Sequence, residues 1–166
     1  MALSANTLPI VMPSISAPFD VMTAFAKAQT LTATGYVNNL NTQINVGTGR
    51  ITGFLALDIT NLKLSAGNET YQFFLLGSND ASFTSGNIDL LAAHDFAAAA
   101  SGRLLPTICA ASPSVPVTGQ SGTRHFIPYS NLMGGYMFQY LQFYTVISGT
   151  SPTVTCSAWL TYDTEC

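Results

Sequence analysis

Charged residues are scarce in this chain. Of its 166 residues, 5 are Lys or Arg and 8 are Asp or Glu, so only 8% are charged and the formal net charge is -3. Soluble domains typically carry about 25% charged residues. The basic residues are scattered at positions 27, 50, 63, 103 and 124, whereas binding to nucleic-acid phosphates needs a basic stripe or patch. We therefore expect no nucleic-acid partner.

Long apolar runs are also missing. Gly, Pro, Asn or Thr interrupts every apolar stretch, and a membrane-spanning helix needs about 18 or more consecutive apolar residues. The first residues have no basic segment, and Pro9 and Pro13 break their apolar part. This pattern predicts neither a membrane partner nor a secretory signal.

Cysteine is rare, with Cys109, Cys156 and Cys166 spread widely along the chain. An odd number at such spacing matches neither a disulfide framework nor a zinc-ligand pattern. We expect Cys109 and Cys156 to be buried thiols in a reducing compartment.

Motifs for catalysis are absent from the sequence. It has no Gly-x-Ser-x-Gly elbow, and none of its Gly clusters has the spacing of a phosphate or dinucleotide loop. His94, Asp95 and His125 could form a metal site only if folding brought the two histidines together. Adjacent strand residues such as His94 and Asp95 point to opposite faces. The sequence predicts no enzyme activity, no cofactor and no metal.

The acidic residues have structural explanations. Asp80, in GSNDASF, can accept hydrogen bonds from its own loop as an Asx-type cap. Asp58 alternates outward between Leu57 and Ile59, and Asp89 adjoins a strand start. A pair of acidic residues acting as acid and base, as in a hydrolase, is the weakest of the functional hypotheses.

What the chain does have is apolar alternation with a period of two, which predicts strands. In RITGFLALDI, Ile51, Leu55, Leu57 and Ile59 share a face. The segments 71–76 and 137–147 are apolar on both faces, as in strands buried between layers. Further strands are expected at 30–37, 88–91, 104–109, 124–128 and 153–162, and a helical turn or two at 19–29 and in the Ala-rich AAHDFAAAAS. The fold prediction is all-β: an antiparallel β-sandwich, most simply a jelly roll, with an immunoglobulin-like topology as the rival.

Residues 1–18 are predicted to form an extended N-terminal arm, and residues 19–166 a single sandwich domain. The arm is uncharged, and Pro9, Pro13 and Pro18 prevent a helix or a central strand. An apolar arm is costly to leave in water, so it packs either on its own domain or on a neighbour. Its candidate interface residues are Leu8, Ile10, Val11 and Met12.

Trp159 is the fifth candidate interface residue, because the alternation in 153–162 places it on the outer, Thr-lined face of its strand. Trp159 and Tyr36 are also the best candidates for stacking on sugar rings. Such strand-face aromatics serve more often in a core or a subunit interface.

Three segments resemble small tailed-bacteriophage capsid cement (decoration) proteins of the jelly-roll type. YQFFLLGSNDASFTSG is similar to their long apolar strand followed by an S-D-D-A-F loop, and YLQFYTVISGTSPTVTCSAWLTYD to their C-terminal hairpin. AKAQTLTATGYVNNLN resembles their A-Q-x-x-T-A-T opening strand and Asn-rich turn. The Pro-rich arm and the Ala-rich insert near 97–100 depart from the family pattern.

The resemblance implies a structural virion protein on the exterior of an icosahedral capsid, assembled in the host cytoplasm. Its implied partners are the major capsid protein and itself, as a homotrimer or homodimer. The alternative is a carbohydrate-binding β-sandwich module of a phage fibre or receptor-binding protein.

Overall fold

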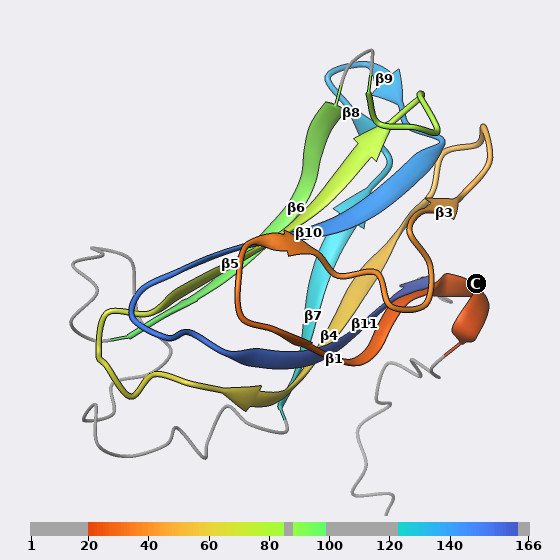
Figure 1. Ribbon diagram of the computed structural model, residues 1–166. Helices are drawn as coiled ribbons and strands as arrows, with labels where there is room; N and C mark the ends of the chain where they lie inside the picture. Colours follow the sequence, from red (N-terminus) through yellow and green to blue (C-terminus); the bar gives the residue numbers. More distant parts are fainter. Residues whose placement is uncertain (1–19, 85–87, 99–122, 163–166) are drawn as a thin grey trace, which may run out of the picture.

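The computed structural model describes residues 20–84, 88–98 and 123–162 of the chain. Figure 1 shows antiparallel strands in two sheets packed face to face, with a small hairpin at one end. The described elements are the 3-10 turn η1 (Val21–Thr23) and the strands β1 (Ala24–Leu31), β2 (Gly35–Tyr36), β3 (Ile44–Asn45), β4 (Thr52–Leu62), β5 (Thr70–Ser78), β6 (Ile88–Ala97), β7 (Thr123–Ser130), β8 (Leu132–Met133), β9 (Tyr136–Met137), β10 (Tyr140–Ser148) and β11 (Val154–Tyr162). The predicted antiparallel β-sandwich is confirmed.

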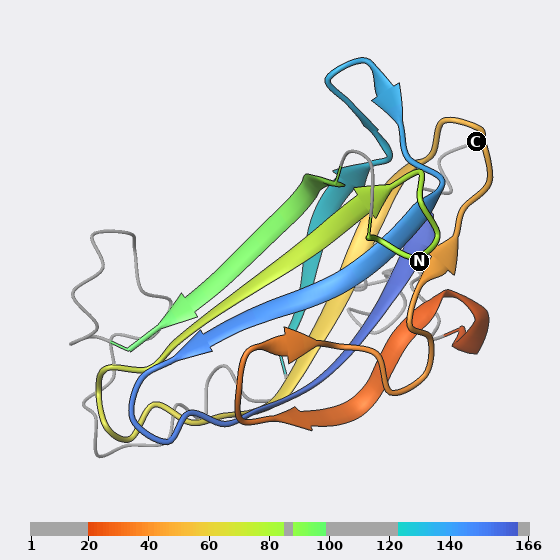
Figure 2. The same ribbon diagram turned by 45° about the horizontal axis from the view of Figure 1, so that its top comes forward.

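The strand order differs from the chain order in both sheets. One sheet, here called the β4 sheet, has the order β1-β11-β4-β7. The other, the β5 sheet, has the order β2-β10-β5-β6, and β3 also pairs with β10. The chain crosses between the sheets after β1, β3, β4, β6 and β10, as well as on its way from β7 to β10. Figure 2 shows the stacked sheets, with β6 and β7 as edge strands on the same side of the sandwich.

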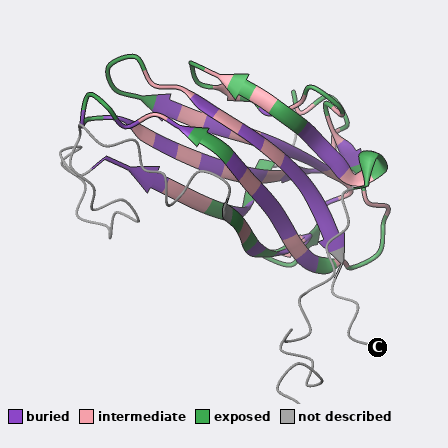
Figure 3. Cartoon of the chain, turned by 90° about the horizontal axis from the view of Figure 1, so that it is seen from below, coloured by how far each residue is buried: buried purple, intermediate pink, exposed green. Residues whose placement is uncertain are grey.

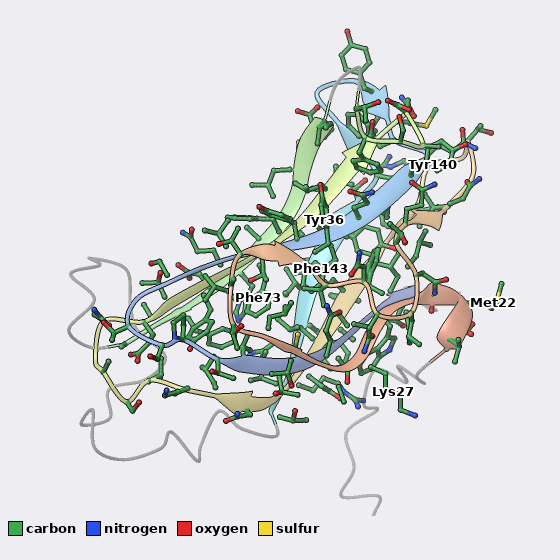
Figure 4. All side chains as sticks on the ribbon, viewed as in Figure 1. Met22, Lys27, Tyr36, Phe73, Tyr140 and Phe143 are labelled. Atoms are coloured by element: carbon green, nitrogen blue, oxygen red, sulfur yellow. The ribbon has the colours of Figure 1, made fainter. Side chains whose placement is uncertain are left out.

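Side chains that alternate along the strands fill the space between the sheets. Leu55, Leu57 and Ile59 of β4 are buried there, as the period of two predicts. From the β5 sheet, the rings of Phe73 and Phe143 stack with their centroids 5.8 Å apart. Figure 4 shows both rings between the sheets, and Figure 3 shows the banding of buried and more exposed residues along the strands.

Of the two helical turns that the sequence allows, the one at 19–29 is present as a single turn, and the one in the Ala-rich segment is absent over its described residues. A single 3-10 turn, η1, occurs in the first, and β1 begins directly after it at Ala24. The second lies in β6 as far as Ala97. β1 and β6 are edge strands of their sheets. The hydrogen bonds of β1 with β11 and of β6 with β5 outweigh the helix propensity of their alanines. The single strand expected at 30–37 was wrong, because β1 starts six residues earlier and ends at Leu31, and Gly35–Tyr36 forms the separate strand β2 in the other sheet.

The expectation that 71–76 and 137–147 would be buried on both faces was also wrong. The inward side chains Tyr71, Phe73 and Leu75 are almost fully buried. Their neighbours Gln72, Phe74 and Leu76 are only partly buried, because the described residues form two layers and no third layer covers this face. One sheet therefore exposes an apolar outer surface.

Candidate functional site: the outer face of the β5 sheet

A row of aromatic side chains crosses the outer face of the β5 sheet. Tyr36 of β2 lies opposite Tyr144 of β10, Tyr144 lies opposite Phe74 of β5, and Phe74 lies opposite Ala93 of β6. Directly opposed residues on neighbouring strands point to the same face. The rings of Tyr36 and Tyr144 meet edge to face, with centroids 4.9 Å apart. The register therefore assembles three rings from separate segments of the chain, the outermost two more than 100 residues apart in the sequence, into one surface.

The rows toward one end of the sheet extend this surface along the strands. The next row places Leu76 opposite Leu90, and the row beyond it brings Tyr140 and Ile88 to the same end of the sheet. Leu90 and Ile88 are 46% and 45% exposed, and Tyr36 is 42% exposed. Figure 4 shows Tyr36 and Tyr140 along β10. We call this set the aromatic face; its members are Tyr36, Phe74, Leu76, Ile88, Leu90, Tyr140, Tyr144 and Val146.

The aromatic face is almost free of charge. β5 and β10 contain no charged residue, and Asp95, opposite Gln72, is the charge that β6 places on this face. Protein interfaces are enriched in aromatic residues and depleted of charge at their centres. The arrangement can therefore bury rings against a neighbouring protein without desolvating an ion.

Sequence reasoning missed the aromatic face, although its signal was present. Strands 71–76 and 137–147 carry apolar residues in both registers, which indicates that each face of the sheet is covered by something. The pattern was interpreted as burial of these strands between layers. The structure leaves the outer face open instead.

Trp159 lies on the outer face of the other sheet, as the alternation predicted, but its ring is buried. It is 1% exposed and packs with Ala24 and Ala56. The guanidinium carbon of Arg124 lies 4.8 Å from the centroid of the indole. Trp159 and Tyr36 therefore lie on different sheets, and the indole is not an open platform for a sugar. Its role in an interface stays a prediction.

The remaining interface candidates, Leu8, Ile10, Val11 and Met12, lie outside the described residues. So do Cys109, Cys166 and the strand expected at 104–109. Cys156 is a buried free thiol, as expected, and burial raises its pKa to about 12.

The structure brings His94 and His125 together, with ring centroids 4.9 Å apart. Asp95 follows His94 but belongs to the opposite face of β6. Within the described ranges, His, Cys, Asp and Glu side chains form no group of three or more that could hold a metal. The pair therefore lacks the carboxylate that a metal site would need from this part of the chain.

Asp80 has the capping role expected of it, and Asp58 lies on the outer face as expected, where it also forms an ion pair that the sequence did not predict. Asp80 accepts hydrogen bonds from the backbone and hydroxyl groups of Ser82 and from the backbone of Thr84. Asp58 forms a two-pronged ion pair with Arg124, at 2.7 and 2.9 Å. In these contacts, neither Asp58 nor Asp80 is paired with a second carboxylate, as an acid–base pair would require.

Neither the protein-family models nor the curated proteins contain a match to this chain. Among the described residues, no helix is long and apolar enough to span a membrane.

Proposed function

We propose that this protein is a structural virion protein that binds the outer surface of an icosahedral capsid and cements neighbouring major capsid protein subunits. The aromatic face carries this proposal, because it offers a broad uncharged surface suited to docking on another folded protein. The three segments that resemble capsid cement proteins support the same function.

The strand order supports the finer assignment of a jelly roll. In a jelly roll, two antiparallel sheets are built from interlocking Greek keys, so successive strands cross repeatedly between the layers. The orders β1-β11-β4-β7 and β2-β10-β5-β6 have such crossings. Their pairing of the first described strand with the last, β1 with β11, fits the same connectivity.

Cementing fits the low charge of the chain and the partial exposure of the rings on the aromatic face. Complete burial of a large apolar side chain contributes about 1.5 to 3 kcal/mol, so finishing the burial of each partly exposed ring contributes about 1 kcal/mol. Repeated contacts over a symmetric shell raise the total binding strength without a tight individual site. Self-association as a homodimer or homotrimer on the capsid exterior would add such contacts.

The test is binding to empty shells of the major capsid protein encoded in the same genome. We expect the purified protein to co-sediment with the shells and Tyr36→Glu to lose most of this binding, because it places a charge in the aromatic row. Asn61→Glu is the matched control, since Asn61 is exposed on β4 of the other sheet. Equal binding by both variants would contradict docking through the aromatic face, and failure of the unaltered protein to bind would contradict cementing.

The carbohydrate-binding alternative has one favourable observation, the adjacent and accessible rings of Tyr36 and Tyr144. Aromatic faces can stack on sugar rings as well as on protein side chains. A glycan array separates the two: binding that Tyr36→Ala abolishes, with no attachment to shells, would favour the sugar-binding function.

A further inference from the structure

The two histidines of the chain meet at the edge of the sandwich where β6 and β7 adjoin. His94 of β6 lies opposite the core residue Phe73, and His125 of β7 lies opposite the core residue Leu57. Since opposed residues point to the same face, both imidazoles point inward between the sheets. β6 and β7 are the last strands of their respective sheets, so the two rings bridge the margin where the layers meet. We call His94 and His125 the histidine pair.

The surroundings of the histidine pair are aromatic, and His94 has a buried nitrogen without a hydrogen-bond partner in the described part of the chain. The ring of Phe96 lies edge-on to both imidazoles, with centroids 4.8 Å from His94 and 5.1 Å from His125. The Nε2 atom of His94 is buried and has no hydrogen-bond partner among the described residues. Such an environment accommodates neutral rings and disfavours two cations 4.9 Å apart.

Few charges from the neighbouring strands compensate for protons on the pair. β5, β10 and β11 contain no charged residue. The charged residues on the strands that pack at this margin are Asp58 on β4, Asp89 and Asp95 on β6, and Arg124 on β7. Asp58 is already paired with Arg124, and Asp95 lies on the outer face. The inward titratable groups Tyr71 and Cys156 have pKa values raised to about 12 and stay neutral.

We propose that the histidine pair is an acid-sensitive latch: the neutral imidazoles hold the β6 and β7 margins together, and protonation of both separates them. The first proton places a single charge on the pair, whereas the second places like charges side by side within an aromatic enclosure. The separation would expose Phe96 and the adjoining core. This inference concerns the fold itself and does not depend on the proposed capsid function.

The directions of the pKa shifts agree with this geometry. Burial lowers the pKa of both imidazoles below 6.5; charge on His125 lowers that of His94 further, while Asp95 partly opposes this shift. Asp58 likewise opposes the shift at His125. A lowered folded-state pKa means that the unfolded chain binds protons first. The stabilisation by the neutral pair is therefore complete above pH 6.5 and is lost as the pH falls from 6.5 through the folded-state values.

Nuclear magnetic resonance tests the latch directly, because the chain contains only two histidines, so every imidazole signal comes from the histidine pair. We expect both titration midpoints to lie below 6.5, and cross-relaxation peaks between the two rings to be present at pH 7.5 and lost when both are protonated. Peaks between Phe73 and Phe143, in the middle of the core, should persist as the control for global folding. Midpoints near 6.5, or ring-to-ring peaks that survive full protonation, would overturn the proposal.

Two single variants separate a latch from a merely structural pair. His125→Asn removes the neighbouring charge, so the midpoint of His94 should rise. Asp95→Asn removes a negative charge from the outer face of β6, so the midpoint of His94 should fall. If neither variant moves the titration midpoint of His94, then His94 is not coupled to His125 and the latch is wrong.

Discussion

The outer faces of the two sheets deal with large apolar side chains in opposite ways. On the β4 sheet, one row runs from Ala24 through Trp159 and Ala56 to Phe126. The indole lies between two alanines and under the guanidinium of Arg124, so the chain covers its own largest ring. On the β5 sheet, the corresponding row sets Tyr36, Tyr144 and Phe74 side by side with nothing comparable above them.

The polar interactions on the outer faces of the two sheets differ as well. Beyond its tryptophan row, the β4 sheet carries the ion pair of Asp58 with Arg124 and a hydrogen bond between the hydroxyls of Thr30 and Thr155. The aromatic face has no ion pair among its described residues. The difference indicates that the chain itself covers the indole on the β4 face, and we propose that a partner covers the aromatic face.

Loss of the indole is expected to have the largest effect on folding. Trp159→Ala leaves a cavity beneath Arg124 and should lower the free energy of unfolding by about 3 to 5 kcal/mol. Urea denaturation followed by circular dichroism measures this loss without relying on tryptophan fluorescence. Trp159→Phe, which keeps a ring, is the control and should lose much less. A loss below about 1 kcal/mol for the alanine variant would mean that the β4 face is not closed by its own packing.

Loss of a ring from the aromatic face should affect attachment more than folding. Tyr144→Ala should weaken shell binding about tenfold, which corresponds to about 1.4 kcal/mol. Its cost to the free energy of unfolding should be about 1 kcal/mol or less, from the lost contact with Tyr36. Asn61→Ala, on the opposite sheet, should change neither quantity. A Tyr144→Ala protein that unfolds easily yet binds normally would reverse the comparison.

Removal of the cation above the indole should have the smallest effect. Arg124→Ala deletes a partly exposed ion pair and a cation–π contact, so the expected loss of stability is about 0.5 to 1 kcal/mol. Acrylamide should then quench the fluorescence of Trp159 more strongly, because Arg124 no longer shields the ring. Unchanged quenching would show that other groups alone seclude the indole.

Local patterns predicted the inner side of the sandwich better than its outer side. The alternation in 51–59 and 153–162 located the inward residues of β4 and β11, because a strand that faces a core on one side has a period of two. The same rule placed Trp159 outward. It could not show the burial of the ring, since the residues that enclose it come from β1, β4 and β7, far along the chain.

The aromatic face and the histidine pair depend on strand register, which the sequence does not reveal. Tyr36 meets Tyr144 only because β2 pairs with β10, and His94 meets His125 only because β6 and β7 end their sheets on the same side. The helix expected in the Ala-rich segment failed for a similar reason, since pairing with β5 decides the conformation of β6. Long-range pairing, rather than local propensity, builds the candidate site.

The central claim is that the open face of the β5 sheet docks on a capsid. Cryo-electron microscopy of empty shells mixed with this protein tests it most directly, at a resolution that distinguishes the two sheets. We predict ordered density at fixed lattice positions, with Tyr36, Phe74 and Tyr144 turned toward a neighbouring protein subunit. Bound protein with this face open to solvent, or shells that remain bare, would contradict the claim.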